Sequence, residues 1–363
     1  LIQCAKIEAR LEAIAAFLAA PDLANTVLGV LKTAPDMARA LNRLAMQRGG
    51  PRDAQAIGQA LQAAEQLAAL LDNMPESCGE LAAQIACLVE QSGQLNGLRQ
   101  RLDDGLDVSL PLLARDGGFI AAGFHRGLDE SRALRDEGRQ VIAGLQNRYA
   151  EETGIKALKI KHNGVLGYHI DVPASQGDKL MQPPHDALFI HRQTLASSVR
   201  FSSSELAELA GQISRAGETA LALELQLFDE LSGDILAARG ALDALAEALA
   251  VIDVNVALAQ KARDENWVRP HLFDDERFLI SDGRHPVVEA ALRHDEGGPF
   301  IANPCALDAK ASTAPRMSVI TGPNMAGKST YLRQNALLAI LAQTGSYVPA
   351  AKAEIGIVDR VYS

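Results

Sequence analysis

Residues 317–330 read MSVITGPNMAGKST and contain the pattern G-x-x-x-x-G-K-[ST], in which a glycine-rich loop binds nucleotide phosphates. A short apolar run at 317–321 precedes the loop, and the apolar segment 331–343 follows it. We therefore expect a strand, a loop and a helix in that order, with the backbone N–H groups of the loop and helix N-terminus facing an anion. The alternative is a glycine-rich turn that contains Lys-Ser by chance.

Each residue type in the pattern has a physical role in phosphate binding. Gly322 and Gly327 permit backbone angles and a close approach that a Cβ atom would block. Lys328 would reach the β- and γ-phosphates of ATP, and the Ser329 hydroxyl would bind Mg²⁺. The predicted nucleotide-binding loop consists of Gly322, Pro323, Asn324, Met325, Ala326, Gly327, Lys328, Ser329 and Thr330.

The composition indicates a globular, mainly helical protein. With 363 residues the chain is long enough for two or three domains, and its 48% of hydrophobic residues is typical of a folded chain. Aromatic residues make up only 4% while Ala and Leu are abundant, which favours helices. The formal net charge of −10 argues against binding nucleic acid over the whole surface.

Four cysteines, Cys4, Cys78, Cys87 and Cys305, form no C-x-x-C pair and have no His at metal-binding spacing. We expect reduced thiols and no zinc site. The sequence begins without an initiator Met and without the pattern of a signal peptide, so we expect it to be part of a longer chain.

The hydrophobic period divides the chain into helical and β-rich parts. Apolar residues at helical spacing predict helices over 5–19, 53–71, 80–95 and 128–152. The period then changes: 157–160 and 165–172 are predicted strands joined by an Asn-Gly turn at 162–164, and 187–191 is a possible further strand.

A second helical pattern begins after this β-rich part. Ser202 and Glu205 have the spacing of a capping box, and the pattern runs without proline from 203 to 266. One continuous helix of that length would extend roughly 90 Å, which suggests a strut or lever with 128–152 as its other arm. The alternative is two or three shorter helices broken at glycines.

The β-rich part is more basic than the rest of the chain. Between residues 153 and 201, Lys156, Lys159, Lys161, Lys179, Arg192 and Arg200 stand against Asp171, Asp178 and Asp186. Such a module fits a confined phosphate-contacting surface, although an ordinary solvated face has the same composition. The candidate phosphate contacts are Lys159, Lys161, His162, Asn163, Arg192, Gln193 and Thr194.

Several motifs together resemble the MutS family of DNA mismatch-repair proteins. The segment Pro323-Asn324-Met325 within the P-loop is the most specific of them. The other segments that resemble the family are GRHPVVE at 283–289, PFIAN at 299–303, GSYVPA at 345–350, GYHI at 167–170, RQTL at 192–195 and PRD at 51–53. The resemblance covers most of the chain.

The resemblance implies a mainly α fold with a small β-rich insertion, followed by the start of an α/β P-loop ATPase domain. Residues 1–152 would be the first part of a helical core or lever, 153–201 a clamp on the DNA backbone, 202–266 the return helix of the lever, and 267–363 the first part of the ATPase domain. By the same resemblance Phe300 stacks on adenine, Ile301 adds a backbone contact and Asn324 faces the γ-phosphate or the attacking water. The alternative for Asn324 is a residue that stabilises the turn. His285 either orients the loop or forms a structural turn.

The implied function is ATP-dependent mismatch recognition by a homodimer in the bacterial cytosol, with ATP or ADP and Mg²⁺ as cofactors, mismatched double-stranded DNA as substrate and a MutL-type factor as partner. No D-x-D-E-type Walker B segment follows Ser329, and no Phe-x-Glu mismatch-reading motif precedes the predicted lever; the one such triplet, at 228–230, lies inside the helical pattern 203–266. We therefore expect no complete catalytic set in this chain, whose missing parts would lie beyond its ends, and no hydrolysis by it alone. The alternatives are a MutS-like protein of recombination or ribosome rescue, and a non-enzymatic DNA-binding scaffold.

Overall fold

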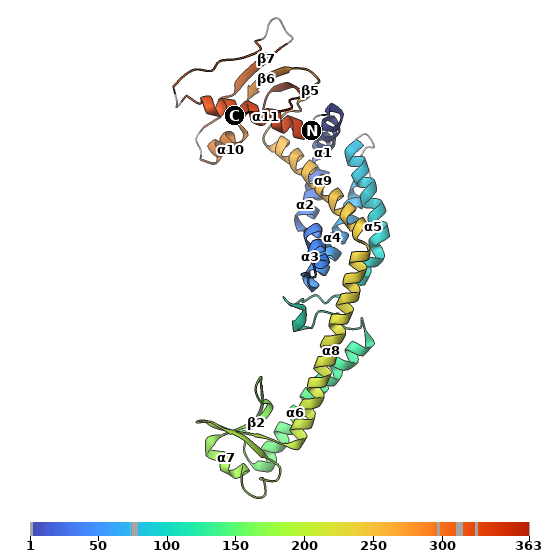
Figure 1. Ribbon diagram of the computed structural model, residues 1–363, viewed down its shortest axis with the longest axis vertical. Coiled ribbons are helices and arrows are strands. Elements are labelled where there is room, and N and C mark those ends of the chain that lie inside the picture. The colour runs from blue at the N-terminus through green and yellow to red at the C-terminus, as the bar shows by residue number, and fades with distance from the viewer. Residues whose placement is uncertain are drawn as a thin grey trace. The chain divides into compact units, whose positions relative to one another are not determined.

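The computed structural model describes residues 3–72, 74, 79–295, 298–309, 315–323 and 326–362 (Figure 1). The helices are α1 (Cys4–Ala19), α2 (Pro21–Thr33), α3 (Met37–Ala45), α4 (Pro51–Leu71), α5 (Gly79–Gly105), α6 (Arg126–Thr153), α7 (Ala174–Leu180), α8 (Ser204–Ala237), α9 (Arg239–Asp264), α10 (Pro286–His294) and α11 (Lys328–Thr344), with a 3-10 turn η1 (Ala114–Asp116). The strands are β1 (Lys159–Asn163), β2 (Gly167–Pro173), β3 (Ile190–Thr194), β4 (Ser198–Ser202), β5 (His271–Phe273), β6 (Arg277–Gly283), β7 (Asn303–Asp308) and β8 (Lys352–Gly356).

The described residues are mainly helical, and their strands form two four-stranded sheets, which confirms the predicted fold class. The chain divides into two compact units. The first unit comprises residues 1–42, 56–99 and 237–363, and the second unit comprises residues 43–55 and 100–236.

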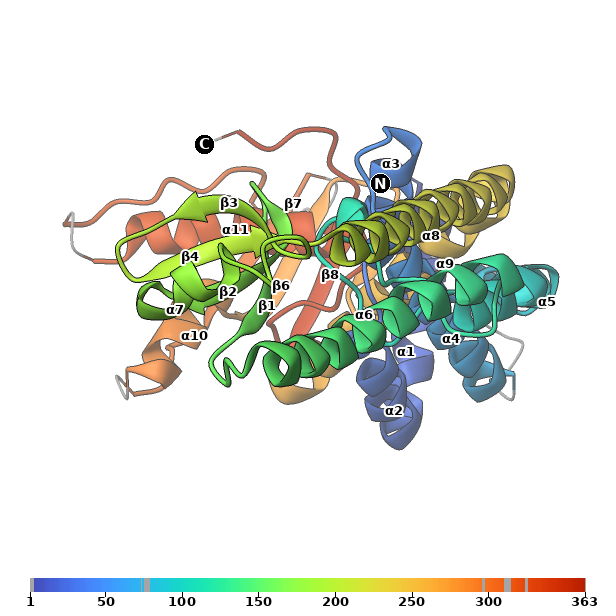
Figure 2. The same cartoon turned by 90° about the horizontal axis from the view of Figure 1, so that it is seen from below.

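The first sheet belongs to the second unit and has the strand order β1-β2-β4-β3, with neighbouring strands antiparallel (Figure 2). One face of the sheet is apolar because Ile170, Val172, Val199 and Phe201 alternate with polar residues along β2 and β4. These side chains are buried in one cluster with Tyr149 of α6.

The predicted hairpin is present, but its turn lies further along the chain than the Asn-Gly pair indicated. Asn163 pairs with Gly167 at the end of the ladder, which leaves residues 164–166 as the loop. The Asn163 side chain accepts hydrogen bonds from the N–H groups of Val165 and Leu166, at 3.0 and 2.8 Å. Gly167 takes the positive φ, +66°. A three-residue loop followed by a left-handed residue, Gly167, therefore replaces the expected two-residue turn.

The predicted continuous helix over 203–266 is instead two helices, α8 and α9, separated at Ala238 with φ −87° and ψ 7°. Gly233 and Gly240 flank the break and lower the helix propensity around it. The cap of α8 also differs from the prediction. Ser203, not Ser202, accepts the N–H of Leu206 at 3.1 Å, because Ser202 is the last residue of β4.

Packing of the first unit involves α1, α2 and α9, and its sheet has the order β5-β8-β6-β7. Strand β8 is parallel to β5 and antiparallel to β6. Helix α11 contacts β6, and its Leu338 and Ala342 are fully buried in a cluster with Ile280 and Ile355. That burial positions α11 and the loop before it.

Among the described residues, no single helix is long and apolar enough to span a membrane. Cys4–Ala19 and Pro21–Ala45 have the length and composition of a membrane span only when they are taken together, and a bend of 105° separates them.

Two carboxylates hold the second unit together in different ways. Glu224 of α8 is buried, pairs with Arg132 of α6 at 2.7 Å and accepts the N–H of Gly118 at 2.5 Å. Asp171 of β2 pairs with Lys161 at 3.0 Å and with Arg200 at 3.6 Å, and it accepts the Ser198 hydroxyl at 3.2 Å. Burial alone would raise the pKa of Asp171, but the hydrogen bond and charge of Lys161, with Ser198 and Arg200, lower it.

We predict that Glu224→Gln lowers the free energy of unfolding by about 1–3 kcal/mol, because it leaves the Arg132 guanidinium without its charge partner. Urea unfolding followed by circular dichroism measures the change. Glu130→Gln is the control: its i,i+4 pair with Arg126 is exposed by 59% and 93%, so the same substitution should cost less than about 0.5 kcal/mol. Equal losses for the two variants would contradict this account of Glu224.

A second prediction concerns pH. Since the folded-state pKa of Asp171 lies below its unfolded value of about 3.9, its stabilisation is complete above that value and is lost as the pH falls through the folded-state pKa. The free energy of unfolding of the wild type should therefore exceed that of Asp171→Asn by the largest amount at pH 7. This difference should shrink below about pH 4. Asp178→Asn, at an exposed position of α7, should follow the wild-type profile. A gap that persists unchanged to pH 2.5 would show that charge is not its origin.

Candidate functional sites

A cavity of about 600 Å³ lies in the first unit between α10, the segment before β7 and the start of α11. It contains residues from both predicted nucleotide-binding segments, although these are separated in sequence. The lining residues are Val288, Leu292, Pro299, Phe300, Ile301, Asn303, Ile320, Thr321, Ala326, Gly327, Lys328, Thr330, Tyr331 and Gln334. The volume is within the range of small-molecule sites, roughly 300–1,000 Å³.

The glycine-rich loop has the backbone that its sequence predicts. Gly322 has φ +146° and Gly327 has φ +82°, angles at which a Cβ atom is strained. Gly327 is the N-cap of α11, so the unpaired N–H groups of the first helical turn lie directly after it. Lys328 donates a 2.5 Å hydrogen bond from Nζ to the carbonyl oxygen of Gly322, which folds the ammonium group over the loop.

The remaining loop residues are placed as follows. Pro323 is exposed, and its carbonyl accepts the N–H of Ala326 at 3.1 Å. Ser329 is exposed in the first turn of α11. Asn324 and Met325 lie outside the described residues. Within the described ranges, no group of three or more His, Cys, Asp or Glu residues is arranged to hold a metal ion.

The segment before β7 supplies the other wall of the cavity. Phe300 is half-buried, whereas the Ile301 side chain is 83% exposed and its carbonyl accepts Nδ2 of Asn303 at 2.9 Å. The Tyr331 hydroxyl of α11 donates to the Pro304 carbonyl at 2.9 Å and ties this segment to the helix. Burial, followed by the neighbouring Cys305, raises the pKa of Tyr331, so the hydroxyl keeps the proton that it donates.

The predicted strand at 317–321 is not a strand in the structure. Met317 and Val319 are 76% and 79% exposed, and none of the described strands forms a ladder with this segment. A strand is stabilised by hydrogen bonds to its neighbours and by burial of alternate side chains, and this apolar run has neither.

His285 does not enter the cavity. It is the N-cap of α10, and its Nδ1 accepts the N–H of Val288 at 3.3 Å. Burial is the main cause that lowers the pKa of His285, and the charge of Arg333 adds to it, so the neutral ring acts as a capping acceptor.

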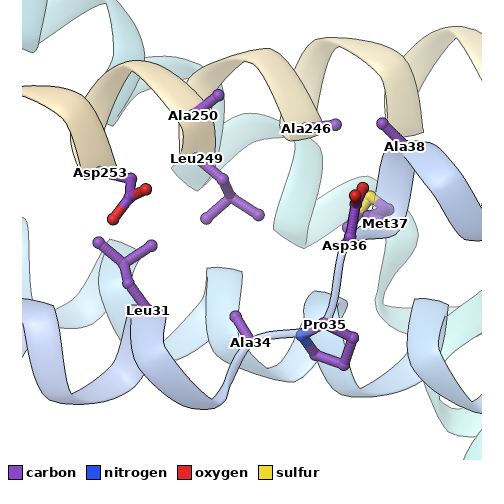
Figure 3. A pocket seen from close by; sticks show the side chains of 10 residues that line it. All are labelled: Leu31, Ala34, Pro35, Asp36, Met37, Ala38, Ala246, Leu249, Ala250 and Asp253. Carbon is purple, nitrogen blue, oxygen red and sulfur yellow. The ribbon is translucent and has the colours of Figure 1, made fainter.

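A smaller cavity of about 300 Å³ lies between α2, the turn before α3 and α9 (Figure 3). Leu31 and Leu249 point into the space between the helices, and Asp36 and Asp253 provide the charged groups. Asp36 accepts the N–H of Arg39 at 2.9 Å and so caps α3. With two carboxylates and no basic residue in its lining, this cavity does not suit a phosphate.

The register of the first sheet separates the candidate DNA contacts. Lys159 and Lys161 share a face with Asp171, Gln193, Ser198 and Arg200, which we call the polar face. Within it, Arg200 donates to Oε1 of Gln193 at 2.9 Å, and Asp171 joins Lys161 to Arg200.

The other candidate contacts lie elsewhere. In the strand register, His162 and Thr194 point to the opposite face, which packs on the apolar cluster. The centroid of the His162 ring lies 4.8 Å from that of Tyr168, and the Thr194 hydroxyl forms a 2.9 Å hydrogen bond with Nε2 of His191. Asn163 is occupied in the turn, and Arg192 lies at the irregularity between His191 and Gln193.

Sequence reasoning did not assign Arg200 and Asp171 to this surface. Both residues were counted in the charge balance, but only the pairing of β2 with β4 brings them together. The signal in the sequence is alternation along β4, where Ser198 and Arg200 alternate with the buried Val199 and Phe201.

Comparisons with known proteins agree with these features. Residues 123–219 match the MutS family domain IV, and residues 318–363 match MutS domain V. The chain is 50% identical over 364 residues to the DNA mismatch repair protein MutS of Rhodopseudomonas palustris strain HaA2, covering 100% of this chain and 40% of that protein. It is 48% identical to the protein of the same name from Nitrobacter hamburgensis (100% and 40%) and 50% identical to that of Ruegeria pomeroyi (98% and 40%).

The chain thus spans about two fifths of the length of these relatives, with similarity along its whole sequence. The two matched domains contain the first sheet with its flanking helices and the glycine-rich loop with α11. The chain belongs to the MutS family.

Proposed function

We propose that this chain is a segment of an ATP-dependent DNA mismatch-repair protein that binds ATP at the glycine-rich loop and duplex DNA at the first sheet. The observation that carries the proposal is the cavity that joins Phe300 to Gly327 and Lys328. Further support comes from relatives named DNA mismatch repair protein. In this assignment 1–152 and 202–266 form the lever, 153–201 the clamp and 267–363 the first part of the ATPase domain.

The residues of the cavity fit a nucleotide. The Lys328 ammonium and the free N–H groups of the first turn of α11 would hold the phosphates, and the Ser329 hydroxyl would contribute to Mg²⁺ binding. Phe300 would pack on the base and the backbone of Ile301 would contact it. Bound ATP with Mg²⁺ supplies a hydrolysable phosphoanhydride bond. We assign nucleotide binding, and not hydrolysis, to the residues of this chain.

The polar face of the first sheet fits the sugar-phosphate backbone of DNA. Lys159 and Lys161 are exposed there, and Arg200 is half-buried beside them. Lys and Arg at such a surface pair with phosphates and position the duplex without reading its sequence. The acidic charge of the whole chain restricts such binding to this local surface.

The wider assignment follows the longer relatives. We propose a homodimer in the bacterial cytosol that engages mismatched double-stranded DNA, recruits a MutL-type factor and couples its nucleotide and DNA sites through the lever. The match of residues 123–219 to domain IV, which includes the sheet, favours this function over a recombination or ribosome-rescue role. The intact loop at 322–330 disfavours a non-enzymatic scaffold.

We predict that Lys328→Ala weakens ATP binding by at least about tenfold, because it removes a charge-assisted contact with the phosphates. Isothermal titration of the chain with Mg·ATP measures the affinity. Lys32→Ala removes an equally charged but exposed side chain of α2 in the same unit, and it should leave the affinity unchanged. Unaltered binding by the Lys328 variant would reject the glycine-rich loop as the nucleotide site.

A matching prediction tests the polar face. Lys159→Ala with Lys161→Ala should weaken duplex binding and reduce the slope of log K against log[salt] by about 2, since two phosphate contacts are lost. Fluorescence anisotropy with a labelled duplex at several salt concentrations measures both quantities. His162→Ala, on the opposite face, is the control and should preserve the slope. The reverse result would assign DNA contact to the other face.

A further inference from the structure

Helix α10 has two functional faces. Val288 and Leu292, one turn apart, line the nucleotide cavity. Glu289 follows Val288 in the sequence, and Arg293 follows Leu292. Their side chains therefore point about 100° around the helix axis from the side that lines the cavity. The ion pair between them, 3.0 Å long, has i,i+4 spacing and lies on the side that faces the end of α9.

The last turn of α9 is bound to this second face of α10. Arg293 pairs with Glu265, the residue that caps α9, at 2.5 Å, and Lys261 pairs with the same carboxylate at 2.9 Å. The hydrogen bond from Lys261 and then that from Arg293 lower the pKa of Glu265 against the effect of burial. Glu265 is therefore a carboxylate at neutral pH, and it joins two helices.

Arg284 adds a second connection at the same place. Its guanidinium donates to the carbonyl oxygens of Glu265 and Asn266 at 3.1 and 2.8 Å, the C-cap residue of α9 and the residue after it. Its Nε lies 3.5 Å from Glu289, close enough for an ion pair but without hydrogen-bond geometry. Asn266 reverses the chain here with φ +52°.

Burial distinguishes this network from ordinary surface pairs. The side chains of Glu289 and Glu265 are only 11% and 15% exposed. In the neighbouring pair of Arg263 and Asp264, at the same end of α9, the exposures are 38% and 54%. Arg293 itself is 48% exposed, so the difference between the pairs lies in the carboxylates, for which screening by water is weaker. The network also connects α9 to α10, whereas Arg263 and Asp264 both belong to α9.

We propose that Glu289 and Arg293 are positioning residues for the nucleotide cavity, and that through them nucleotide binding is coupled to the last turn of α9. The proposal rests on the proposed nucleotide site. Because α10 is one continuous helix of 9 residues, displacement of the α9 end would be passed to Val288 and Leu292, which line the cavity with Phe300. The coupling is reciprocal: nucleotide in the cavity also restrains residues 261–266.

The test compares Arg293→Met with the matched control Arg263→Met in the complete chain. Arg293→Met should weaken Mg·ATP binding about three- to tenfold, and Arg263→Met should not change it. Arg293→Lys keeps the charge but cannot contact Glu265 and Glu289 with two separate guanidinium nitrogens, so it should give an intermediate affinity. This variant replaces Arg293→Met in the test if the Met variant does not fold.

Hydrogen–deuterium exchange supplies a readout that lost stability alone would not produce. In wild type, Mg·ATP should slow exchange both at 328–331, in the cavity, and at 261–266, outside it. In Arg293→Met the protection at 328–331 should remain under saturating nucleotide while that at 261–266 is lost, and Arg263→Met should retain both. Wild type that shows protection at 328–331 alone, or an Arg293 variant that retains both effects, overturns the coupling. Wild type with no protection at either place overturns the nucleotide site and, with it, this inference.

Discussion

Helix α11 is held in place by the burial of its later turns, and the candidate nucleotide site depends on that burial. Leu338 and Ala342 pack in the hydrophobic cluster against the sheet β5-β8-β6-β7 of the first unit, and the fully buried Gln334 lies one turn before Leu338. The first turn can therefore project beyond the packed region with its N–H groups free. A helix that was less firmly anchored would not hold Lys328 at a defined distance from Phe300.

Much of the fold could be predicted from the sequence, because apolar residues recur at helical spacing in several segments and glycines mark many of the turns. Helices α1, α4 and α6 begin and end within two residues of their predicted limits. The failures occur where local preference competes with context. Residues 317–321 have the composition of a strand but no neighbouring strand among the described residues, and the long pattern after β4 contains a break at Ala238 that no proline marks.

The candidate site was harder to predict than the fold. The glycine-rich loop can be predicted from a local pattern. That Phe300 lies close to the loop was expected only from the family resemblance, because packing of segments distant in sequence brings the two together. Nothing in a single sequence indicates that the Glu289 carboxylate is buried or that Arg293 also pairs with Glu265, since the same i,i+4 spacing is common on solvated helices. The faces of the first sheet likewise required the register, in which a shift of one residue would exchange His162 with Lys161.

Asp171 has a consequence for any anion that approaches the polar face. Its carboxylate holds Lys161 and Arg200 in fixed positions, so an incoming phosphate meets side chains that have already lost part of their rotamer freedom. The same carboxylate competes with that phosphate for both cations. Pre-ordering lowers the entropic cost of binding while competition weakens each contact. The net affinity of the polar face for a polyanion is therefore set by the balance of these two effects of one carboxylate.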